Sequence, residues 1–180
     1  SSIGSGNGCG EDVCEFLKSI LVNIDGNGFL FVVYVNGNLV GVGPSRYGQT
    51  PDGQDVLYYN TYDVTKLLAA GDNCLSTINY TTGGRAFLSQ LTLYYKDGTS
   101  EIISNSARDA KNWCALPADD VFGMDNSIGT NYFLAHANNI NASLYPFGFG
   151  KAGFDDSAWN SVFVTEKIGG EMLLLPSQTD

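Results

Sequence analysis

The stretch at residues 29–43, FLFVVYVNGNLVGVG, decides the fold of this chain. Residues 29–35 are an unbroken run of apolar, β-branched and aromatic side chains, and a second apolar run follows Asn36-Gly37. An Asn-Gly pair between two such runs predicts a hairpin, because a type I′ turn requires positive φ at both central residues. A strand that is apolar on both faces is buried on both faces. We therefore predict a central β-strand and a hairpin, which the rest of the chain covers.

The composition favours many short strands around one core. The chain has 180 residues, of which 43% are hydrophobic and 16% are charged, and this suits one globular domain. It contains 22 glycines, 10 tyrosines and 10 phenylalanines, and glycine turns combined with aromatic residues are typical of short strands. The formal net charge of -10 argues against nucleic acid and anionic membranes as partners, whereas it suits a neutral ligand, a cation or plain solubility. Without a run of roughly 18 apolar residues, we expect no membrane insertion.

Alternation and turn residues place further strands along the chain. A period of two begins at Lys18, and we predict other strands at 56–64, 74–80, 86–95, 99–103, 132–137, 162–167 and 172–175. A short helical turn is predicted at 63–68 with Asp63 or Thr65 as its N-cap, and residues 44–55 are expected to form a long polar loop. This pattern predicts an all-β fold, an antiparallel β-sandwich of jelly-roll type with one or two helical turns. We divide the chain into a Gly/Ser-rich extension (1–17), the sandwich (18–167) and a C-terminal tail (168–180).

The four cysteines allow two disulfides in an oxidising compartment. We predict the pairs Cys9–Cys14 and Cys74–Cys114. Four reduced thiols in an intracellular protein are the alternative. Two sequons, at Asn79 and Asn141, are candidate N-glycosylation sites. The chain also opens at Ser1 without a methionine, as a processed mature form would. We expect a secreted, extracellular glycoprotein.

Three motifs in one order resemble a known family. They are YVNGNLVG at 34–41, TYDVTKLLAAGDN at 61–73 and GFDDSAWNSV at 153–162, and LSQLTLYYKDGTS at 88–100 is similar to a hairpin of the same module. Over residues 18–165 the chain resembles the galactose-binding-like jelly-roll domains of glycoside hydrolases, above all the N-terminal module of bacterial α-L-rhamnosidases. The resemblance implies a β-sandwich that binds L-rhamnose or a related sugar through a bound calcium ion. It implies no catalysis, because the hydrolytic carboxylates of that family sit on a separate helical barrel.

The residues themselves also argue against an enzyme. Glycoside hydrolysis needs two carboxylates that face a cleft, whereas the adjacent Asp155 and Asp156 suit a turn with Trp159 packed beneath it. His136 is the only histidine, and neither a GxSxG elbow nor a CxxC pair accompanies it.

Sugar binding requires aromatic faces and paired hydrogen-bonding groups, which loops at one end of a sandwich can supply. The candidate sugar-binding residues are Arg46, Tyr47, Asn79, Tyr80, Arg85, Asp125 and Asn126, and the candidate calcium ligands are Asp52 and Asp55. In the resembling modules, the loop after the strand equivalent to 75–78 carries an acidic or amide residue that meets calcium and sugar. The matching Asn79-Tyr80 lacks an aspartate, which puts calcium-mediated binding in doubt, and a glycan on Asn79 would occupy this loop.

Three functions therefore stay open. The first is a non-catalytic carbohydrate-binding module or lectin for rhamnose-containing glycans. The second is a secreted structural glycoprotein, such as a coat, adhesive or filament subunit, whose edge strands form a homo-oligomer or filament. The third is a fragment of a larger glycosidase.

Overall fold

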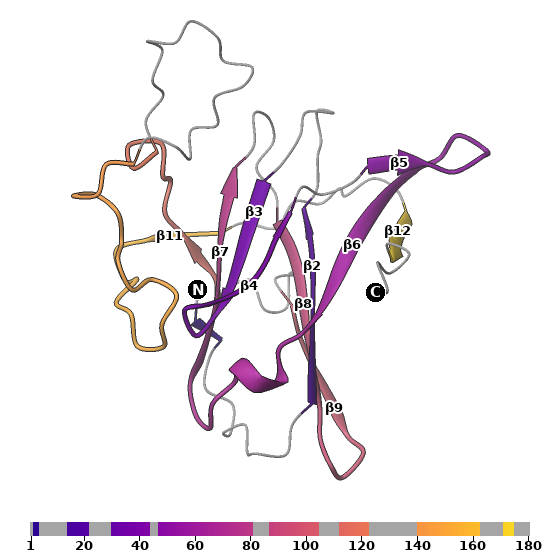
Figure 1. The fold of residues 1–180 in the computed structure, drawn as a ribbon, viewed down its shortest axis with the longest axis horizontal. Helices are drawn as coiled ribbons and strands as arrows, with labels where there is room; N and C mark the ends of the chain where they lie inside the picture. The colour runs from indigo at the N-terminus through magenta and orange to yellow at the C-terminus, as the bar shows by residue number, and fades with distance from the viewer. Residues whose placement is uncertain are drawn as a thin grey trace, which may run out of the picture.

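The computed structural model describes residues 2–3, 14–21, 30–43, 47–80, 87–104, 112–122, 140–162 and 171–174. Their regular structure is β-strand, apart from one 3-10 turn, η1 (Thr65–Leu67), and the two larger sheets form a sandwich (Figure 1). The predicted all-β sandwich is confirmed. Among the described residues, no helix is long and apolar enough to cross a membrane.

The strands form three sheets. The four-stranded sheet has the order β1 (Ser2–Ile3), β7 (Asn73–Tyr80), β3 (Leu30–Val35) and β4 (Asn38–Gly43). The six-stranded sheet has the order β12 (Glu171–Leu174), β6 (Asp55–Asp63), β2 (Cys14–Leu21), β8 (Phe87–Tyr94) and β9 (Ser100–Ser104), and β5 (Tyr47–Gln49) also pairs with β6. The third sheet is the short pair of β10 (Cys114–Ala115) and β11 (Asn160–Ser161). Neighbouring strands are antiparallel except for β12 and β6, which are parallel.

The predicted central strand and its hairpin are confirmed. Strand β3 lies between β7 and β4, so its backbone is hydrogen-bonded on both edges. Asn36 and Gly37 have φ values of 50° and 77°, the positive pair that a type I′ turn needs. On one face of β3, the side chains of Phe31, Val33 and Val35 are buried in the core. On the other face, Tyr34 is half-buried.

The core lies between the two larger sheets. Its buried side chains come from both of them and from the segment before η1; they are Phe31, Val33, Val35, Val64, Leu75, Leu91 and Leu93. Burial of such a side chain is worth about 1.5–3 kcal/mol. The sheets approach each other so closely that a Cβ atom at Gly41 of β4 would lie 2.5 Å from the Tyr62 ring of β6. A side chain at position 41 would therefore have to displace the Tyr62 ring.

Two buried amides join the hairpin turn to β7. Asn36 Nδ2 donates to Leu67 O (2.9 Å) and to Asn73 Oδ1 (2.6 Å), while Asn36 Oδ1 accepts from Cys74 N (2.8 Å). Asn73 in turn accepts from Ala69 N at 2.8 Å. These bonds satisfy polar groups that would be costly to bury alone, and they fix the β3–β4 hairpin against the loop that follows η1.

Some details differ from the predictions. The six-stranded sheet begins at Cys14 and includes β12, so the sandwich extends beyond the predicted limits of 18 and 167. Most of the predicted polar loop at 44–55 is the β5–β6 hairpin instead. The N-cap of η1 is Val64, although Asp63 Oδ1 does accept from Thr65 N at 3.0 Å. The predicted strand at 132–137 lies outside the described residues.

Candidate functional site

The β5–β6 hairpin carries the predicted calcium ligands, and we call residues 47–57 the arm. The arm projects from one side of the molecule, and Asp52 lies in its exposed turn (Figure 1). The polar groups of this turn bind one another. The Thr50 hydroxyl donates to Asp52 Oδ1, and Gln54 N donates to Thr50 Oγ at 3.0 Å. The backbone of Asp55 pairs with Gln49. The arm is thus a turn that satisfies its own polar groups.

Calcium binding by Asp52 and Asp55 of the arm stays a prediction. Calcium takes six to eight oxygen ligands, including several carboxylates. No cluster of three or more potential metal-binding side chains (His, Cys, Asp or Glu) occurs in the part of the chain that the structure describes.

The predicted sugar-binding residues that the structure describes lie apart, because Tyr47 begins the arm and the other two lie in β7. Asn79 and Tyr80 lie in β7, where their backbones pair with Phe31 and Leu30. The side chain of Asn79 is exposed, and its Oδ1 accepts from Thr77 Oγ at 3.0 Å. Strand β7 and the tip of the arm lie on opposite sides of the molecule (Figure 1). The remaining candidates Arg46, Arg85, Asp125 and Asn126 lie outside the described residues, as do Cys9 and His136.

The predicted Cys74–Cys114 disulfide is absent from this structure. The two thiols donate to different acceptors. The Cys74 thiol lies 3.6 Å from Phe149 O, and the Cys114 thiol lies 2.9 Å from Asp156 Oδ2. Burial, and then the hydrogen bond to Asp156, raise the pKa of Cys114 to about 11, so this thiol keeps its proton at neutral pH. Both acceptors belong to one segment near the C-terminal end of the sandwich.

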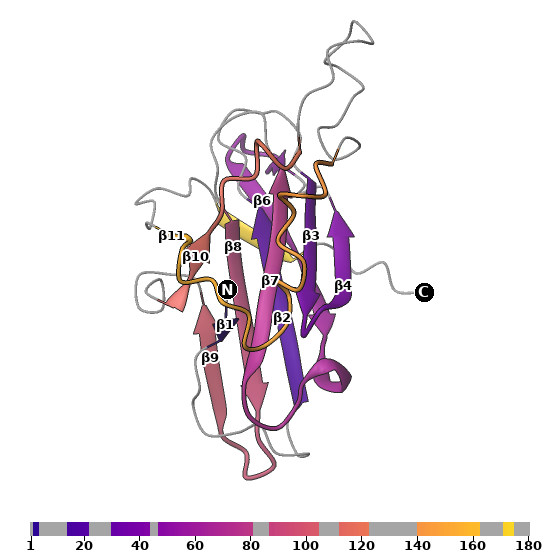
Figure 2. The same ribbon diagram turned by 90° about the vertical axis from the view of Figure 1, so that its left-hand side faces the viewer.

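That segment, residues 140–162, crosses the outer face of the four-stranded sheet, and we call it the strap. It runs over β7 in Figure 2. Phe149 packs edge-on against Tyr34 of β3, with ring centroids 5.9 Å apart. At the buried Gly150, a Cβ atom would lie 3.0 Å from Ser76 Oγ and 3.3 Å from Gly37 Cα. The strap therefore lies so close to the sheet that a side chain at position 150 would press on Ser76 and Gly37.

Aromatic side chains brace the strap from within. Phe149 contacts Trp159, and Trp159 contacts Phe154, at centroid distances of 6.5 Å and 5.7 Å. The pair Asp155-Asp156 forms the predicted turn before Trp159. Ser157 N donates to Asp155 Oδ1 at 3.1 Å, Trp159 N donates to Asp156 O at 2.9 Å, and the Ser157 bonds lower the pKa of Asp155. These carboxylates serve the turn and the Cys114 thiol.

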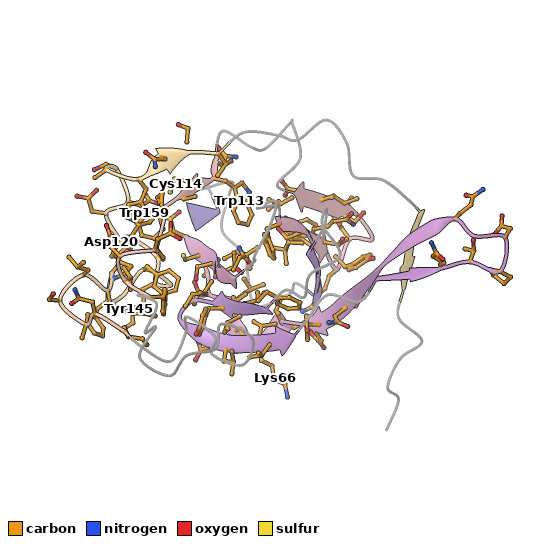
Figure 3. All side chains as sticks on the ribbon, turned by 90° about the horizontal axis from the view of Figure 1, so that it is seen from above. Lys66, Trp113, Cys114, Asp120, Tyr145 and Trp159 are labelled. Carbon is orange, nitrogen blue, oxygen red and sulfur yellow. The ribbon has the colours of Figure 1, made fainter. Side chains whose placement is uncertain are left out.

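The outer surface of the strap carries Leu144, Tyr145 and Phe147, which we call the platform. Leu144 is 51% exposed and Phe147 is 71% exposed. The Phe147 ring lies 4.9 Å from that of the half-buried Tyr145, which is itself 6.1 Å from Phe149. Burial, and then the neighbouring Tyr34, raise the pKa of Tyr145, so its hydroxyl is neutral and can donate or accept. Figure 3 labels Tyr145, Trp159 and Cys114 on the side opposite the arm.

Sequence reasoning did not single out the platform. The glycines and phenylalanines of residues 147–153 indicate only a turn region. The available signal is the run YPFGF at 145–149, in which three aromatic residues alternate with Pro146 and Gly148. In the structure, Phe149 packs inward while Phe147 is exposed.

Comparisons with known proteins relate this chain to others by fold. No protein-family profile matches the sequence, and neither does any curated protein. A solved α-L-rhamnosidase from Dictyoglumus thermophilum superposes on 89% of this chain and 18% of its own, with a TM-score of 0.52 and 16% identity. A Streptomyces avermitilis α-L-rhamnosidase complexed with L-rhamnose is 23% identical over 89% of this chain and 17% of its own, with a TM-score of 0.48. This chain thus spans less than a fifth of each of those chains and shares the fold of one segment of the Dictyoglumus thermophilum enzyme.

Proposed function

We propose that this chain is a non-catalytic carbohydrate-binding domain whose platform stacks against a sugar ring. The observation that carries the proposal is the 71% exposure of Phe147 beside Tyr145 on a braced segment. A singly exposed apolar side chain is ordinary, whereas several exposed apolar groups side by side mark an interaction site. Leu144, three residues before Phe147, is also exposed.

Sugars suit this surface for chemical reasons. One face of a pyranose presents C–H groups, which pack on an aromatic ring, while hydroxyls around its edge need hydrogen-bonding partners. The neutral Tyr145 hydroxyl and the amide of Asn141 can serve as partners. Asn141 is only one turn away, since Leu144 N donates to Asn141 O at 3.1 Å. A net charge of -10 favours a neutral sugar over an anionic one.

L-Rhamnose and rhamnose-containing glycans are the first ligands to consider. The sequence motifs resemble the sugar-binding module of rhamnosidases, and the fold is shared with one segment of such an enzyme. A role for calcium, through Asp52 and Asp55, and a secreted location remain proposals. Binding without hydrolysis agrees with the structural use of Asp155 and Asp156 in a turn.

Calorimetry tests the proposal. L-Rhamnose, D-galactose and D-glucose are titrated into the full chain, once with calcium and once with a chelator. We expect heat of binding for at least one sugar, lost on Phe147→Ala and retained on Phe147→Trp, because tryptophan preserves the stacking face. The matched control is Thr50→Ala in the arm, which should bind as the wild type does. Absence of heat at millimolar sugar in both conditions overturns the proposal, whereas loss with chelator alone assigns a role to calcium.

Self-assembly is a second candidate function, and strand β4 favours it. Strand β4 is the edge of its sheet, and β3 is its only partner strand among the described residues. Residues 38–43 (NLVGVG) include no charge or proline, the usual protection of an edge, and Leu39 and Val42 are 58% and 53% exposed. Light scattering that shows a concentration-dependent oligomer, abolished by Val42→Lys, would support assembly. A monomer at every concentration excludes it.

A further inference from the structure

The sequon at Asn141 lies in an exposed turn beside the platform. Asn141 N donates to Val121 O at 2.7 Å, and Phe122 and Ile140 form an antiparallel bridge, so the turn is attached to a fixed point of the chain. Ser143 N and Ser143 Oγ both donate to Asn141 Oδ1, at 3.2 Å and 2.7 Å. These bonds use the carbonyl oxygen only. The Asn141 Nδ2 group, where a glycan would be attached, keeps both of its hydrogens for chemistry.

The second sequon has a different setting. Asn79 lies within β7, and its backbone belongs to the ladder with Phe31. N-glycosylation sequons are characteristic of surface loops, where the acceptor can be presented to a large enzyme and the attached glycan can extend into solvent. The turn at Asn141 meets this description, whereas the strand at Asn79 does not.

We infer that Asn141 is an N-glycan acceptor and that the attached glycan covers the platform. The inference rests on the proposed sugar binding and on the secreted location predicted from the sequence. Leu144 lies one turn from Asn141, and Phe147 follows beside Tyr145. The first sugar of a glycan on Nδ2 therefore starts next to an exposed apolar face that suits a sugar ring.

Attachment turns this glycan into a competitor of free sugar. A ligand tethered close to its site has an effective concentration in the millimolar range, which a weakly binding free sugar must exceed. The modification would thus regulate the platform. The unmodified domain binds external sugar, and the glycosylated domain has its platform shielded.

The first measurement locates the glycan. The full chain is secreted from a eukaryotic host, and its intact mass is compared before and after treatment with peptide N-glycosidase, which leaves an aspartate at the modified position. We expect a glycan at Asn141 in the wild type and in Asn79→Gln, and none at this site in Asn141→Gln or Ser143→Ala. An unmodified Asn141 overturns the inference.

The second measurement tests the shielding. The affinity for free sugar is compared between the glycosylated wild type, wild type made in a host without N-glycosylation, and Ser143→Ala, which removes the sequon and keeps Asn141. We expect the glycosylated form to bind about tenfold or more weakly, as a tethered competitor requires. Equal affinity in all three samples overturns the shielding. If wild type made in a host without N-glycosylation binds no sugar at all, the proposed function itself fails, while the mass result still decides whether Asn141 is modified.

Discussion

The arm and the strap are both surface segments rich in turns, yet they use their side chains in opposite ways. In the arm, Thr50, Asp52 and Gln54 bond with one another around an exposed turn. In the strap, Phe149 packs against the sheet, while Phe147 on the same segment is left 71% exposed. The polar composition of the arm predicts a binding loop there, but it is the strap that has the arrangement a ligand surface needs. It holds a firmly packed layer beneath an exposed ring.

The difference teaches how to weigh polar loops. Short polar side chains such as Thr and Asp bond readily to their own turn, and this leaves fewer groups for a ligand. The ring of a phenylalanine has no hydrogen-bonding group that its own turn could satisfy. It must be buried or remain exposed at a cost in free energy. An exposed ring on a braced segment is therefore the stronger indication of a binding surface.

Removal of the ring that braces the strap should have the largest effect. Phe149→Ala deletes the contacts with Tyr34, Tyr145 and Trp159, and we expect the free energy of unfolding to fall by about 2–4 kcal/mol. Urea denaturation measures this loss. The matched control is Phe147→Ala, because the exposed ring should contribute under about 0.5 kcal/mol to stability. Equal losses for the two variants would contradict the division into a braced and an exposed ring.

Close packing at Gly150 gives a second test of the strap. Gly150→Ala places a Cβ atom 3.0 Å from Ser76 Oγ and 3.3 Å from Gly37 Cα, and a backbone atom cannot move aside as a side chain can. We expect a loss of about 1–3 kcal/mol, as overpacking in a core causes. Ala152→Ser, at an exposed position of the strap, is the control. A stability of Gly150→Ala within error of the wild type would mean that the strap lies farther from the sheet.

A smaller effect is expected in the arm. Asp52→Ala removes one hydrogen bond in an exposed turn, so the stability should fall by no more than about 1 kcal/mol and sugar affinity should not change. Thermal unfolding and calorimetry provide the two readouts. A loss of sugar binding in this variant would show that the sugar-binding site lies in the arm and not on the platform.

The smallest effect concerns the Cys114 thiol, which bonds to Asp156 of the strap. The pKa of Cys114 is raised from 9.0 to about 11, so any contribution of its protonated form to stability is complete below pH 9 and is lost as the pH rises through about 11. The rate of alkylation of Cys114 should follow the thiolate fraction and reach half of its maximum near pH 11. Asp156→Asn should lower this midpoint, because it removes a charge that raises the pKa. A midpoint at or below 9 in the wild type would show that the thiol does not bond to Asp156.

The fold was predictable because its signals are local. Asn36-Gly37 predicts its own turn, and the apolar run before it predicts a strand with two neighbours. The strand pairings of the terminal segments could not be predicted. The contact of β12 with β6 joins positions far apart in the chain, and no short-range pattern encodes it.

The candidate site was much less predictable. The disulfide between Cys74 and Cys114 was inferred from an even count, whereas in the structure each thiol bonds to the strap. Whether Phe147 or Phe149 is exposed depends on which ring meets Tyr34, a contact between segments more than a hundred residues apart. Alternation of aromatic residues suggests that the rings separate, but the sequence does not say which one turns outward.

A sugar titration followed by backbone amide NMR tests the central claim most directly, because it monitors strap and arm in one sample. We predict that added sugar shifts the signals of Leu144, Tyr145 and Phe147 and leaves those of Thr50, Asp52 and Gln54 in place. Shifts confined to the arm, with a silent strap, would contradict the account.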